Sequence, residues 1–105
     1  REFLYVDDLA DAVVFLMNNY NATDIGEFVN IGMGKDITIK ELAEIVKEIV
    51  GFKGEIEWDT SKPDGTPQKL LNVERIHKLG WKAKISLKDG IIADYKEYAD
   101  EINSL

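Results

Sequence analysis

The sequence opens with REFLYVDDLADAVVFLMNN, residues 1–19, and this stretch decides which fold class the chain can adopt. Its segment Phe3–Val6 is apolar and aromatic, which is typical of a short strand. Asp7 and Asp8 then place two carboxylates in the first turn of a helical pattern, where the positive end of a helix favours them. The apolar residues of that pattern recur at helical spacing over a wide face: Leu9, Ala10, Ala12, Val13, Val14, Phe15, Leu16 and Met17. The stretch therefore predicts a strand followed by a helix that is covered on more than one side.

Farther along the chain, strand and helix patterns continue to alternate. Glu27–Ile31 is short and apolar, and Glu55–Trp58 alternates polar with apolar residues, so both predict strands. Helices are expected to begin at three capping residues, Thr38, Asn72 and Ser86. Glycines expected to end helices are Gly51 and Gly80.

These patterns together predict an α/β fold of about four helices and three short strands, with residues 1–105 forming one domain. The side chains expected in its core are those on the apolar faces of the helices and strands. They are Leu9, Val13, Leu16, Leu42, Val46, Ile49, Trp58 and Tyr95.

Composition narrows the possible partners. Of 105 residues, 45% are hydrophobic and 31% are charged, the balance of an ordinary globular protein. The net charge of -7 repels nucleic acid and anionic lipid surfaces, so neither is an expected partner. Because the chain has no cysteine, disulfides and thiolate metal sites are excluded, and the cytoplasm is the expected location. The start at Arg1, without a methionine or an apolar leader, is typical of a fragment of a longer protein.

Motifs for self-contained chemistry are scarce. His77 has no second histidine or cysteine near it in sequence, so we expect it to pack or to face solvent rather than to bind a metal. The run Gly32-Met33-Gly34 lacks the third glycine of a dinucleotide fingerprint and is expected to be a turn. Asp7 and Asp8 are expected to compensate the helix dipole. Glu55, Glu57 and Asp59 are expected to lie on a solvated strand surface, and no metal site is predicted.

The most specific stretch is the aperiodic loop from Trp58 to Asn72, where Asp64-Gly65 between two prolines predicts a turn. The run Ser-Lys-Pro-Asp-Gly-Thr-Pro at 61–67, followed by Lys-Leu-Leu at 69–71, resembles the GDP-L-fucose synthase family of the extended short-chain dehydrogenase/reductase superfamily. The opening residues 1–10 look like the segment with which nucleotide-sugar epimerases and dehydratases enter their substrate lobe. Further matching segments are Asn30-Ile31-Gly32, Thr38-Ile39-Lys40-Glu41-Leu42, Leu79-Gly80-Trp81 and Ile85-Ser86-Leu87.

The resemblance implies that the chain is the C-terminal substrate-binding lobe of such an enzyme, with the Rossmann domain and the catalytic residues upstream of Arg1. These enzymes epimerise GDP-4-keto-6-deoxy-D-mannose and reduce it with NADPH to GDP-L-fucose. No catalytic residue, cofactor site or metal site is expected in this chain, which alone should be inactive. NADP(H) would be bound by the N-terminal domain, and the parent enzyme is expected to be a homodimer.

Four residues are carried over as substrate-binding candidates. Arg1 and Lys69 match the basic positions of the family motifs and would reach the diphosphate of the GDP-sugar. Asp64 and Thr66 either bind the nucleotide or shape the loop. The chain departs from the family at Gln68, where relatives often have a basic residue. Two further departures are Glu55, where some members are basic, and Tyr5, where histidine is frequent.

Two other functions remain open at this point. The same opening segment would suit another NAD(P)-dependent nucleotide-sugar epimerase or dehydratase, and only the 58–72 loop favours fucose synthase. Alternatively, the chain is a standalone acidic interaction domain whose apolar first helix docks a partner.

Overall fold

The computed structural model describes all 105 residues, and its regular secondary structure consists of helices only. Its helices are α1 (Val6–Asn19), α2 (Ala22–Ile25), α3 (Ile39–Val50), α4 (Glu74–Leu79) and α5 (Leu87–Asn103). No residue is in a β-strand. The prediction of an α/β lobe with about four helices and three strands was therefore wrong.

Each of the three expected strands lacks a neighbouring segment of the chain with which it could form a ladder of backbone hydrogen bonds. Residues 3–5, 27–31 and 55–58 are outside every helix, and the backbone hydrogen bonds outside the helices include none that joins two of these segments. Strand hydrogen bonds must come from another segment, whereas helix bonds come from residues four positions away. A strand-like pattern without a partner segment therefore stays an extended connection.

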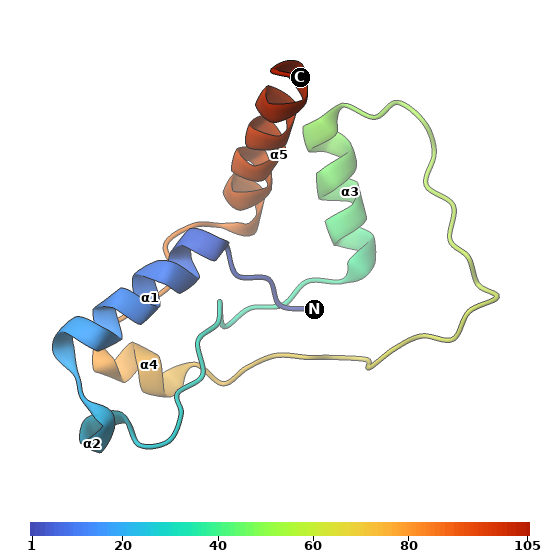
Figure 1. The fold of residues 1–105 in the computed structure, drawn as a ribbon. Coiled ribbons are helices and arrows are strands. Elements are labelled where there is room, and N and C mark those ends of the chain that lie inside the picture. Colours follow the sequence, from blue (N-terminus) through green and yellow to red (C-terminus); the bar gives the residue numbers. More distant parts are fainter.

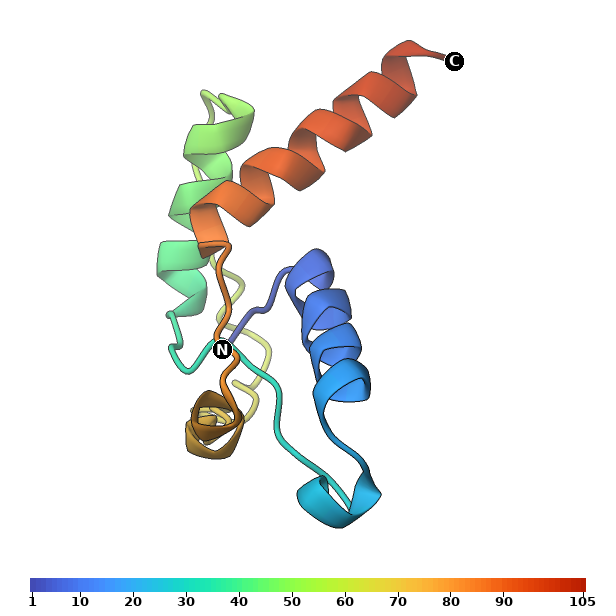
Figure 2. The ribbon, with the colours of Figure 1, turned by 90° about the vertical axis from the view of Figure 1, so that its left-hand side faces the viewer.

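One local exchange of backbone hydrogen bonds does occur. The backbone nitrogen of Arg1 donates to the carbonyl of Ile37 at 2.7 Å, and the N–H of Ile37 donates to the carbonyl of Arg1 at 2.9 Å. This is the pairing of opposed residues in an antiparallel ladder, limited to a single pair. It fixes the start of the chain beside the start of α3, as Figure 1 and Figure 2 both show.

The predicted helix ends are largely confirmed. The Thr38 hydroxyl accepts from the N–H of Glu41, and the Ser86 hydroxyl accepts from the N–H of Asp89. Gly51 and Gly80 end α3 and α4 at φ 71° and φ 109°, a region that favours glycine. The α4 helix begins at Glu74, whose N–H bonds the Asn72 side chain.

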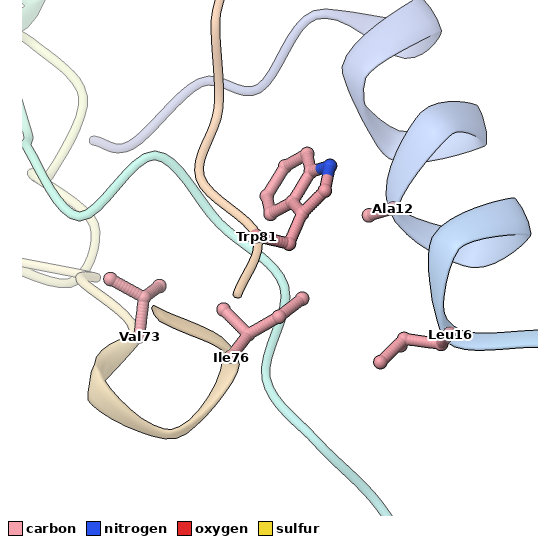
Figure 3. Packing of buried hydrophobic residues seen from close by; sticks show 5 residues of the cluster. All are labelled: Ala12, Leu16, Val73, Ile76 and Trp81. Carbon is pink, nitrogen blue, oxygen red and sulfur yellow. The ribbon is translucent and has the colours of Figure 1, made fainter. Parts of the chain in front are cut away.

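The buried core is small and lies between α1 and α4. Ala12 and Leu16 come from α1, Val73 and Ile76 from the start and middle of α4, and Trp81 from the segment after it (Figure 3). Of the expected core residues only Leu16 is buried. The expectation was wrong for the other seven, which are half-buried or exposed: Leu9, Val13, Leu42, Val46, Ile49, Trp58 and Tyr95.

The second part of the structure is the pair α3 and α5, which pack against each other away from the core (Figure 1). Between α3 and α4 the chain follows a long exposed connection over residues 51–72. The whole measures 52 × 39 × 19 Å. The apolar outer face of α1 is exposed at Val6, Val13, Val14 and Met17, so the cover on more than one side that the sequence predicts for this helix is not provided by these 105 residues.

The sequence predicts that Asp8 compensates the dipole of its own helix. In the structure Asp8 also binds backbone groups outside that helix. It is 3% exposed, and its Oδ2 accepts from the backbone N–H groups of Lys84 and Ile85 at 3.1 and 2.9 Å. Two N–H bonds satisfy a carboxylate that burial would otherwise penalise. Asp8 thereby joins α1 to the segment that leads into α5.

Asp11, one turn farther along α1, makes a second connection of this kind. Its Oδ2 accepts from the Trp81 indole N–H at 2.9 Å and lies 3.4 Å from the Lys84 ammonium nitrogen. Figure 3 shows the indole nitrogen turned toward α1. The hydrogen bond from Trp81, with Lys84 nearby, lowers the pKa of the Asp11 carboxyl below its ordinary value.

Acid should therefore weaken the α1–Trp81 contact. A carboxyl whose folded pKa is depressed adds stability above its unfolded pKa of about 4, and this stability is lost as the pH falls through the folded value. The midpoint temperature of thermal unfolding should fall less between neutral pH and about pH 3 for Asp11→Asn than for wild type, because Asn cannot titrate. An equal acid-induced drop in both proteins would contradict this role for Asp11.

Candidate functional site

A polar hollow of about 550 Å³ lies where the start of the chain, the segment before α3 and the 58–72 loop meet. A hollow of this size suits a small-molecule ligand. Its lining residues come from those three segments: Arg1, Asp36, Ile37, Thr38, Ile39, Asp64, Gly65, Thr66, Pro67 and Gln68.

Arg1 is the only cationic side chain in this lining. One guanidinium nitrogen, Nη1, donates to the carbonyl of Thr66 at 2.5 Å. Its Nη2 lies so close to Gly65 that a Cβ there would sit 3.2 Å away. Arg1 makes no salt bridge with any carboxylate, so its charge remains available to an anionic ligand.

Two carboxylates share the hollow with Arg1. The Asp36 Oδ2 accepts from the Gln68 amide Nε2 at 2.6 Å, a bond that ties the segment before α3 to the loop. Asp64 also lines the hollow. The positive lining is therefore limited to Arg1, and Gln68 is engaged by Asp36.

The structure brings three of the four sequence-predicted site residues together and leaves the fourth outside. Arg1, Asp64 and Thr66 line the same hollow, and Thr66 contributes its backbone carbonyl. Lys69 directly follows the lining residue Gln68, but it is exposed and does not line the hollow.

The loop itself is shaped differently from the prediction. No turn is present at Asp64-Gly65, and the turn lies at residues 60–61 instead. There the Asp59 Oδ1 accepts from both the N–H and the hydroxyl of Ser61, at 3.0 and 2.5 Å. These two bonds lower the pKa of the Asp59 carboxyl. Asp59 thus stabilises the outer end of the loop.

Sequence reasoning missed two residues at this place, Glu2 and Asp36. The Glu2 carboxylate accepts from the N–H groups of Gly34 and Leu71, and Asp36 holds Gln68. Glu2 had a visible signal, since it is a carboxylate directly before the apolar run Phe3–Val6. Asp36 had none, because its partner lies 32 positions away.

The run Gly32-Met33-Gly34 does not have the geometry of a dinucleotide phosphate loop. The N–H of Gly34, which a phosphate would need, donates to Glu2, and α3 begins only at Ile39 rather than on the glycines. His77 is half-buried on α4, with its ring near Gly34. No group of three or more His, Cys, Asp or Glu side chains is arranged to hold a metal ion. The helices are too short or too polar for any of them to cross a membrane.

Comparison with known proteins gives consistent matches. Residues 1–32 match the model of the NAD dependent epimerase/dehydratase family. The chain is 56% identical to a probable GDP-L-fucose synthase of Oryza sativa subsp. japonica, over 99% of this chain and 31% of that protein. It is 43% identical to the GDP-L-fucose synthase of Escherichia coli (strain K12), over 95% of this chain and 33% of that protein.

Solved structures match as well. A GDP-6-OMe-4-keto-L-xylo-heptose reductase from C. jejuni is 45% identical, with a TM-score of 0.90 over 96% of this chain and 31% of that one. A GDP-mannoheptose C4 reductase from Campylobacter jejuni, with NADP bound, is 46% identical, with a TM-score of 0.83 over 94% of this chain and 31% of that one. The chain thus spans about a third of the length of the proteins it matches. Over nearly its whole length it is a homologue of the GDP-L-fucose synthases, and its residues 1–32 match the NAD dependent epimerase/dehydratase family.

Proposed function

We propose that this chain is the GDP-sugar-binding part of an NADP-dependent GDP-L-fucose synthase. In that enzyme, GDP-4-keto-6-deoxy-D-mannose is epimerised and reduced to GDP-L-fucose. The identity to synthases from plants and bacteria supports the reaction class. The residues of this chain would bind and orient the nucleotide half of the substrate, while hydride transfer would belong to a part of the enzyme that binds NADP(H).

The observation that carries the proposal is the placement of Arg1. Its guanidinium donates to the Thr66 carbonyl in a hollow of about 550 Å³ and forms no salt bridge, although Asp36 and Asp64 line the same hollow. A planar guanidinium can donate two parallel bonds to phosphate oxygens. Lys69 would add a second cation if the exposed end of the loop closes over the ligand, at a cost in ordering the loop. Asp64 and Thr66 would shape the near side of the pocket.

A second reading is that the chain serves another nucleotide-sugar enzyme. It is also 38% identical to a putative UDP-glucose 4-epimerase of Methanocaldococcus jannaschii, over 87% of this chain and 28% of that protein. The two readings differ in the base of the nucleotide. A competition experiment with GDP and UDP, using the longest natural protein that contains this chain, distinguishes the two functions. A GDP-L-fucose synthase should bind GDP more tightly than UDP.

The chain alone should not oxidise NADPH, with or without GDP-sugar, because hydride transfer needs a nicotinamide held against the sugar. It should bind GDP weakly, since the loop must be ordered on binding. The measurements are NADPH absorbance during incubation with substrate and GDP titration by calorimetry. Turnover by the 105-residue chain would contradict the assignment of binding alone to these residues.

A further inference from the structure

The Glu2 carboxylate lies at the junction of all three segments that form the hollow. Its Oε2 accepts from the N–H of Gly34 at 2.6 Å, and its Oε1 accepts from the N–H of Leu71 at 3.1 Å. The three residues are far apart in sequence, so these bonds are long-range connections. Charge-assisted bonds to backbone N–H groups are among the stronger hydrogen bonds in proteins.

The packing around this carboxylate is close. A Cβ on Gly32 would sit only 2.7 Å from the Glu2 Oε2, so a side chain there would displace the carboxylate. Gly34 adopts φ 76°, and a Cβ there would sit 2.8 Å from a methyl carbon of Val73 in the core. The two glycines let the 32–34 segment approach Glu2 on one side and the core on the other.

Each segment that Glu2 connects carries site residues a few positions away. Arg1 directly precedes Glu2, Asp36 and Ile37 follow Gly34, and Lys69 lies two residues before Leu71. Because its two oxygens are engaged by backbone donors, Glu2 makes no salt bridge with Arg1. The carboxylate therefore ties the segments together without neutralising the cation beside it.

We propose that Glu2 is a positioning residue for diphosphate binding, which fixes the returning end of the 58–72 loop relative to Arg1. The inference rests on the proposed function, since it concerns the same hollow. Glu2 does not touch the ligand. It holds Leu71, at the base of the loop end that carries Lys69, so that less of the loop has to be ordered when the exposed Lys69 moves toward a diphosphate bound at Arg1. Without it a longer part of the loop must be ordered on binding.

The test uses Glu2→Gln in the longest natural protein that contains this chain. A glutamine oxygen can replace one of the two acceptors and its NH2 group can replace neither. The Michaelis constant for the GDP-sugar and the dissociation constant for GDP should rise roughly tenfold, with a smaller change in turnover number, because a lost positioning bond weakens ground and transition states alike. Glu57→Gln, which removes the same charge from an exposed residue just before the 58–72 loop, is the matched control and should change neither constant.

Backbone hydrogen exchange in the unaltered protein provides a second readout. The Gly34 and Leu71 amides should be protected before any ligand is added, and Leu71 should lose protection in Glu2→Gln. If wild type binds GDP and Glu2→Gln binds it equally well, the positioning role is wrong while the proposed function stands. If wild type does not bind GDP, the proposed function fails. If Glu2→Gln does not fold, fast exchange at Gly34 and Leu71 in wild type would still overturn the inference.

Discussion

Replacing Trp81 with alanine should lower the free energy of unfolding by about 3–5 kcal/mol, the usual cost of truncating a buried tryptophan. A domain of this size has roughly 5–15 kcal/mol in total, so much of the population should unfold at moderate temperature. Trp81 is 3% exposed, it belongs to the five-residue core, and its indole N–H holds Asp11. Its removal leaves a cavity between α1 and α4 and takes away the partner of a carboxylate.

Trp58 is the matched control for this experiment. It is 51% exposed and lies in the long connection between α3 and α4, so Trp58→Ala should cost less than about 1 kcal/mol. Denaturant unfolding followed by circular dichroism measures both variants. Equal losses at the two tryptophans would mean that the core is not where the structure places it.

The same pair of tryptophans shows how far the sequence could predict burial. Trp58 ends a segment with alternating polarity and was expected in the core, but alternation marks a half-buried strand only when a neighbouring strand covers one face. Trp81 follows a helix-ending glycine in a segment without periodicity, and so no pattern pointed to it. Its burial comes from the long-range approach of α4 to α1, which residue spacing does not encode.

Local interactions, by contrast, were predictable. Thr38, Ser86, Gly51 and Gly80 lie where the sequence placed the helix ends, because caps involve residues within four positions of one another. The short helix α2 was missed. Its capping residue is Asn21, whose side chain accepts from the N–H groups of Thr23 and Asp24.

The candidate site was predicted in part for a similar reason. Arg1, Asp64 and Thr66 were identified through their motifs, and the structure brings them to one hollow. Glu2 and Asp36 were not identified, because their roles consist of hydrogen bonds to residues 32 or more positions away. The hydrogen bonds of Glu2 and Asp36 show what holds the segments of this hollow together.

The two basic residues of the proposed site should each contribute strongly to substrate affinity. A charge-assisted hydrogen bond to phosphate is worth about 1.5–3 kcal/mol, which is roughly ten- to a hundredfold in binding. In the longest natural protein containing this chain, Lys69→Met should raise the Michaelis constant for the GDP-sugar by about that factor. Arg1→Lys should also raise it, because a point charge cannot reproduce a two-pronged guanidinium contact.

The turnover number should change less than the Michaelis constant in both variants, since the diphosphate is bound in the ground state and in the transition state. Lys62→Met is the control for Lys69, because Lys62 is an exposed cation of the same loop outside the hollow. It should leave both constants near wild type. Thermal unfolding of each variant separates lost affinity from lost folding.

The Michaelis constants of Lys69→Met and Arg1→Lys for the GDP-sugar, determined beside the turnover numbers, decide whether these two residues bind the diphosphate. We expect a rise of roughly ten- to a hundredfold in the Michaelis constant for Lys69→Met with a much smaller fall in turnover. An unchanged Michaelis constant in both variants, with or without a collapse in turnover, would contradict the claim that these residues bind the diphosphate.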